Sequence, residues 1–120
     1  MSRPDGPDRV EVLFTAEFKR SLRRLAKRYR GVRRDLGPLI DRLERGEMPG
    51  NRVQGVGRVV YKVRVANSDA QRGKSGGYRV VYYVQTAERV VLVTVYSKSE
   101  QGDVSAAALR RIIGEGPPAP

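Results

Sequence analysis

The sequence contains no cysteine, no histidine and no tryptophan among its 120 residues. Without cysteine there can be no disulfide framework, and without cysteine and histidine there is no zinc site of the usual kind. The same absences exclude a catalytic triad, a cysteine nucleophile and a histidine general base. Any catalysis must therefore use other side chains, and we expect neither a metal nor a cofactor.

Long apolar runs are also missing, since none approaches the roughly 18 residues that a membrane-spanning helix needs. Residues 1–8 lack the apolar stretch of a signal peptide. We therefore expect a cytoplasmic protein with no membrane partner. One domain is expected over residues 9–113, with disordered tails at 1–8 and 114–120 where proline and glycine are frequent.

Basic residues are abundant: Lys and Arg total 24 against 13 for Asp and Glu, which gives a formal net charge of +11. Such a surplus indicates a polyanionic partner, with nucleic acid favoured over a membrane surface. The alternative interpretation is that the surplus serves solubility alone and reflects the arginine codons of a GC-rich genome.

Hydrophobic periodicity predicts an α+β domain of the order β-α-α-β-β-β-α. The expected strands are 9–14, 58–65, 78–84 and 89–97, and the expected helices are 15–29, 32–43 and a last one ending at 113. Thr15 and Asp103 are the predicted N-caps of the first and last helices. Pro38 either kinks the second helix or marks its first turn. Helices should cover one face of a small, mostly antiparallel sheet, and 48–57 should be a loop.

Alternation along the three later strands assigns their side chains to two faces. The helix side should receive the valine-rich positions, among them Val91, Val93 and Val95. The other side then collects Lys62, Arg64, Arg79, Tyr83, Tyr96 and Lys98. This face has no acid within its strands, and it is predicted to bind phosphates and stacked bases. The alternative is the ordinary solvated face of an antiparallel sheet.

Two further basic segments are candidates. The glycine-rich stretch 67–77 contains Gly-Lys-Ser, but Ser68 stands where a nucleotide-binding loop needs glycine, and a strand rather than a helix follows. We expect a flexible loop that presents Arg72 and Lys74 to a phosphate, with a long hairpin connection as the alternative. The first helix carries Arg20, Arg23, Arg24 and Lys27. This is a possible second RNA-facing surface, although a charge run is more often a solvated face.

Three motifs, YKVRV at 61–65, GKSGGYRVVYY at 73–83 and YSKSE at 96–100, carry a resemblance to the RelE/ParE toxin superfamily. The chain is most similar to HigB-like RelE members, over residues 10–113. The resemblance implies a RelE-like fold and a toxin of a type II toxin–antitoxin system. The implied activity is metal-independent cleavage of mRNA in the ribosomal A site. The implied partners are mRNA, the ribosome with its 16S rRNA, and a cognate antitoxin of the DNA-binding helix-turn-helix kind.

In this family the ribose 2′-hydroxyl attacks the adjacent 3′-phosphate, which requires a base, cations around the phosphorane and a proton for the leaving 5′-oxygen. Position by position, the family's basic residues match Lys62, Arg64, Arg79 and Lys98. Neighbouring cations favour the neutral form of a lysine, so a lysine could act as the base. Arg64 and Arg79 suit the phosphorane. Lys74 is a candidate for holding the substrate or for supplying the proton.

The chain departs from the family where RelE has an arginine and a tyrosine after the last strand, because Ser99 and Ser105 stand there. Tyr96 or Tyr83 could replace that tyrosine, though at other positions. Two alternative functions stay open at this stage. One is inhibition of DNA gyrase by a ParE-like toxin of the same fold, and the other is RNA binding without catalysis.

Overall fold

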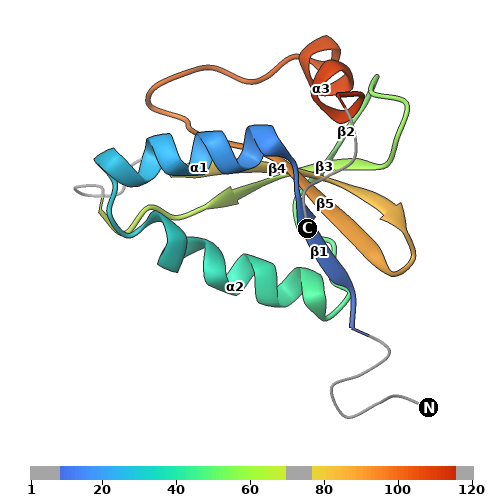
Figure 1. Ribbon diagram of the computed structural model, residues 1–120, viewed down its shortest axis with the longest axis horizontal. Coiled ribbons are helices and arrows are strands. Elements are labelled where there is room, and N and C mark those ends of the chain that lie inside the picture. Colours follow the sequence, from blue (N-terminus) through green and yellow to red (C-terminus); the bar gives the residue numbers. More distant parts are fainter. Residues whose placement is uncertain (1–8, 70–76, 116–120) are drawn as a thin grey trace.

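The computed structural model describes residues 9–69 and 77–115, and its elements form an α+β fold (Figure 1). In chain order they are β1 (Glu11–Phe14), α1 (Ala16–Arg28), α2 (Val32–Glu44), β2 (Asn51–Val53), β3 (Val60–Val65), β4 (Tyr78–Thr86), β5 (Arg89–Ser97) and α3 (Ala106–Ile113). The strands form one sheet in the order β1-β5-β4-β3-β2. The predicted tail 1–8, all but the first two residues of the predicted tail 114–120, and the loop residues Arg72 and Lys74 lie outside the described residues.

Helices α1 and α2 pack on one face of the sheet, as predicted (Figure 1). Thr15 is the N-cap of α1, because its Oγ1 accepts the backbone N–H of Phe18 at 2.9 Å. The hydroxyl of Thr15 also donates to the carbonyl of Val93 at 2.7 Å, which fixes the start of α1 against β5. Helix α2 continues through Pro38. The core beneath the two helices includes Phe18, Leu25, Leu36, Leu43, Tyr78, Val80 and Tyr82.

The antiparallel pairings of β3 with β4 and of β4 with β5 match the predicted, mostly antiparallel sheet, whereas the pairing of β1 and the existence of β2 were not predicted. β1 pairs in parallel with β5, so the sheet is mixed. The predicted loop 48–57 contains the short strand β2, which pairs with residues 60–62 of β3. The strand expected from residue 58 begins at Val60. Short edge strands and parallel pairs depend on distant partners, which local pattern does not reveal.

The opposite face of the sheet is not wholly solvated, because α3 covers part of it (Figure 1). A second core forms there from Val56, Val60, Val81, Tyr83, Val91, Val93, Tyr96 and Leu109. The prediction that helices cover a single face was therefore wrong for α3.

The prediction of which β5 side chains lie on the helix side was also partly wrong. Val81 pairs with Thr94 but Tyr82 pairs with Leu92, so Val93 is an extra residue in β5. Such a bulge changes the phase of alternation. Val91 and Val93 consequently lie in the second core, whereas Val95 lies under the helices as expected.

The last helix is capped by Ser105, whose Oγ accepts the backbone N–H of Ala108 at 3.1 Å. The prediction that Asp103 caps it was wrong, since serine is as good a cap as aspartate and lies directly before the helix. Asp103 is therefore left for other contacts. Among the described residues no helix is long and apolar enough to cross a bilayer. The same part of the chain holds no cluster of acidic side chains suited to a metal ion.

Candidate functional site

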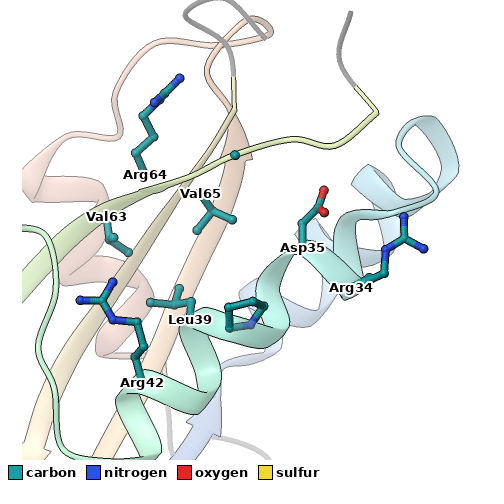
Figure 2. A pocket seen from close by; sticks show the side chains of 9 residues that line it. Arg34, Asp35, Leu39, Arg42, Val63, Arg64 and Val65 are labelled. Carbon is teal, nitrogen blue, oxygen red and sulfur yellow. The ribbon is translucent and has the colours of Figure 1, made fainter. Parts of the chain in front are cut away.

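Basic side chains of β3 lie on the face of the sheet opposite α1 and α2. Figure 2 shows Val63 and Val65 directed toward α2, while Arg64 between them points the other way. Lys62 alternates with Val63 in the same manner and shares the face of Arg64. The cavity of about 360 Å³ whose lining residues are drawn in Figure 2 lies between α2 and β3, and Arg64 is one of the residues that line it.

Strand register extends this face across the sheet. Arg64 pairs with Arg79 of β4, and Arg79 pairs with Tyr96 of β5. Side chains directly opposite one another are neighbours, and like charges in such a pair are destabilising. A phosphate between the two guanidinium groups would relieve that repulsion. The Arg64–Arg79 pair therefore places two guanidinium groups where one anion could contact both.

The guanidinium group of Arg79 is partly buried in the sheet. Its Nη1 atom is buried and has no hydrogen-bond partner among the described residues. Leaving a buried donor unpaired typically costs about 1–3 kcal/mol, and more for a charged group. The arginine is thus held in place at a cost that an anionic ligand could offset.

Asp103 lies against the basic face and was not predicted to do so. Its Oδ1 is 3.2 Å from Nζ of Lys62 and 3.6 Å from Nζ of Lys98, and it accepts the hydroxyl of Tyr96 at 3.2 Å. The hydrogen bond and charge of Lys62, followed by Tyr96 and Lys98, hold the pKa of the Asp103 carboxyl below its usual value. The face is acid-free within its strands, as expected, but the loop after β5 brings an acid onto it.

Neither predicted tyrosine is exposed for base stacking. Tyr83 is 5% exposed in the second core, with the guanidinium of Arg58 over its ring at 5.2 Å. Tyr96 is 4% exposed. Burial raises the pKa of Tyr96 to about 12, and the charge of Asp103 adds to this effect. At neutral pH the hydroxyl of Tyr96 therefore keeps its proton and can donate a hydrogen bond.

The predicted basic surface of α1 is present and lies on the helix side of the molecule. Arg20, Arg23, Arg24 and Lys27 are all exposed. Arg20 forms an ion pair with Glu17 at 2.8 Å. Within the described residues, no carboxylate lies within ion-pair distance of the other three. The helix thus presents cations that are available to a polyanion.

The structure therefore brings together four of the predicted catalytic positions, Lys62, Arg64, Arg79 and Lys98, at one end of a single sheet face. Arg72 and Lys74 fall outside the described residues. Asp103 is the residue that sequence reasoning missed at this site. The sequence did contain a relevant feature, because Ser105 is as good an N-cap as Asp103. With Ser105 capping α3, the Asp103 carboxylate has no capping function.

The family described as the RelE toxin of the RelE/RelB toxin–antitoxin system matches residues 14–113. The matched segment begins at the last residue of β1 and ends at the last residue of α3. It therefore contains every element that contributes to the basic face.

Proposed function

The chain belongs to the RelE toxin family, the toxin half of toxin–antitoxin systems, and from this premise we propose that it is a ribosome-dependent endoribonuclease. Its substrate in this proposal is mRNA in the ribosomal A site, so its place of action is the cytoplasm. A cognate antitoxin is the partner that family membership implies. We further propose that this antitoxin is a DNA-binding helix-turn-helix protein encoded by an adjacent gene.

The observation that carries the proposal is the juxtaposition of Arg64 with Arg79, flanked by Lys62 and Lys98. Arginine keeps its charge and binds phosphate oxygens through two parallel N–H donors. Two arginines on neighbouring strands can therefore hold one phosphodiester and stabilise the extra negative charge of its transition state.

The proposed reaction is an internal transesterification. The 2′-oxygen forms a bond to phosphorus while the bond from phosphorus to the 5′-oxygen breaks, which leaves a 2′,3′-cyclic phosphate and a 5′-hydroxyl. Arg64 and Arg79 stabilise the phosphorane. One side chain accepts the 2′ proton and a protonated lysine gives a proton to the 5′-oxygen. Among the residues that the structure describes, the candidates for these two proton transfers are Lys62 and Lys98. Lys74 is a further candidate for giving the proton to the 5′-oxygen.

Primer extension on ribosome-bound message during expression tests the proposed function. We expect new 5′ ends within the codon that occupies the A site, and none when Arg79 is replaced with alanine. Intact message accompanied by DNA damage would instead support gyrase inhibition. Intact message without DNA damage would support RNA binding alone. Either result would contradict the nuclease proposal.

The basic surface of α1 is proposed to bind ribosomal RNA rather than the scissile phosphate. Replacing Arg23, Arg24 and Lys27 with alanine should weaken binding to ribosomes. The slope of log affinity against log salt concentration should fall by about two to three, because each lost phosphate contact contributes nearly one unit. Sedimentation with ribosomes over a range of salt concentrations measures both quantities, and the turnover rate at saturating ribosome should stay unchanged.

The matched control removes the same charge from arginines that already have acidic partners. Arg42 and Arg45 contact Glu47, and Arg89 contacts Glu11. Their triple alanine variant should keep most of the ribosome affinity. Equal losses in the two variants would show that net charge alone, and not the α1 surface, determines binding.

A further inference from the structure

Three donors from β3 and the end of β5 converge on one oxygen of Asp103. They are Nζ of Lys62, Nζ of Lys98 and the hydroxyl of Tyr96, at 3.2, 3.6 and 3.2 Å from Oδ1. Two ammonium groups and one hydroxyl around a single anionic oxygen would bind a phosphate oxygen equally well. The carboxylate thus occupies a small oxyanion site within the basic face.

The part of the chain that supplies this anion belongs to no regular element. Asp103 lies in the segment between β5 and α3, outside both, and its side chain is 54% exposed. Its carboxyl keeps its negative charge at neutral pH, because the neighbouring Lys62 lowers its pKa. By contrast, Lys62 lies on β3 and Tyr96 on β5, so two of the donors stand on the rigid sheet. Displacing the anion requires moving a loop residue, whereas the donors can stay in place.

We infer that the Asp103 carboxylate occupies the place of an RNA phosphate oxygen and thereby disfavours the binding of free RNA. The inference rests on the proposed function, since it concerns the same site. An RNA phosphate that enters the site must displace Asp103 from Lys62 and Lys98. Free RNA binds only if its contacts with the protein contribute more binding free energy than is lost when Asp103 leaves Lys62 and Lys98. The ribosome already holds the message in position, so displacing Asp103 weakens the binding of ribosome-bound message less than that of free RNA.

The test is the binding of a short RNA whose 2′-hydroxyls are all methylated, so that no cleavage can occur. Fluorescence anisotropy without ribosomes gives the Kd for wild type and for Asp103→Asn. The asparagine keeps the shape of the side chain and removes its charge. Exposed ion pairs are weak, so losing two should tighten binding about three- to tenfold.

Asp41→Asn is the matched control, because it makes the same chemical change and the same charge change on the exposed surface of α2. It should tighten binding less than twofold, since a distant surface charge is largely screened. A gain for Asp103→Asn no larger than that for Asp41→Asn would overturn the inference. So would a loss of affinity, which would mean that the carboxylate positions the lysines for RNA instead of excluding it.

A second measurement separates this inference from the proposed function. Asp103→Asn should cut unmethylated RNA in the absence of ribosomes faster than wild type, and should still cut message on the ribosome. If wild type cuts no message on ribosomes, the proposed function fails, while the anisotropy comparison still decides whether Asp103 competes with phosphate. If Asp103→Asn loses cleavage on the ribosome without binding free RNA more tightly, the inference fails and the nuclease proposal stands.

Discussion

Replacing Arg79 with alanine is expected to abolish growth arrest and to lower the rate of mRNA cleavage on ribosomes by about 10²- to 10³-fold, the usual cost of removing one donor from a transition-state oxyanion. Arg79 lies between Arg64 and Tyr96 across three strands, so it is the central cation of the basic face. Its guanidinium has a buried nitrogen without a partner in the described part of the chain. Removing it should therefore leave the fold intact or slightly more stable.

The measurements are single-turnover cleavage on programmed ribosomes and urea unfolding of the purified variant. Arg89→Ala is the matched control, because Arg89 is also a strand arginine but forms an exposed ion pair with Glu11 at 3.1 Å. Such pairs contribute little, so this variant should keep its activity. A folded Arg79→Ala protein that still arrests growth would place the reaction elsewhere on the molecule.

Replacing Phe18 with alanine should lower the free energy of unfolding by about 3–5 kcal/mol, because it removes a large buried side chain and leaves a cavity. Phe18 is 1% exposed in the core beneath α1, and its ring centroid is 5.5 Å from that of Phe14. Small domains are stable by only about 5–15 kcal/mol in total. For a domain of this size the melting temperature should fall by more than about 10 °C.

Urea and thermal unfolding, followed by circular dichroism, measure this effect. Leu22→Ala on the same helix is the control, since Leu22 is only partly buried at the edge of that core. It should cost clearly less than Phe18→Ala. Equal and small losses in both variants would mean that α1 contributes little to the core, contrary to the packing seen here.

The sequence predicts those parts of the fold in which local pattern and tertiary structure agree. Thr15 caps α1 as expected, and simple alternation places Lys62, Arg64 and Arg79 correctly, because no bulge interrupts β3 or the first part of β4. The same rule fails in β5 at Val93, where one extra residue changes the faces. A bulge depends on the partner strand, so it leaves no mark in the periodicity of β5 itself.

The sequence predicted the cations of the candidate site but not its anion, Asp103. The cations lie in strands, where alternation predicts which face a side chain is on, or directly after one; they are Lys62, Arg64, Arg79 and Lys98. Asp103 comes from an irregular segment, whose path depends on where Ser105 starts α3. The buried positions of Tyr83 and Tyr96 also required the structure, because α3 covers a face that periodicity alone leaves open.

The parallel pairing of β1 with β5 affects the order in which the sheet forms. Glu11 pairs with Arg89, so within the described residues the first strand pairs with a strand 78 positions further along the chain. Contacts so distant in sequence form late, after local helices and hairpins. We therefore expect β1 to join the sheet only after the antiparallel strands β3, β4 and β5 have paired.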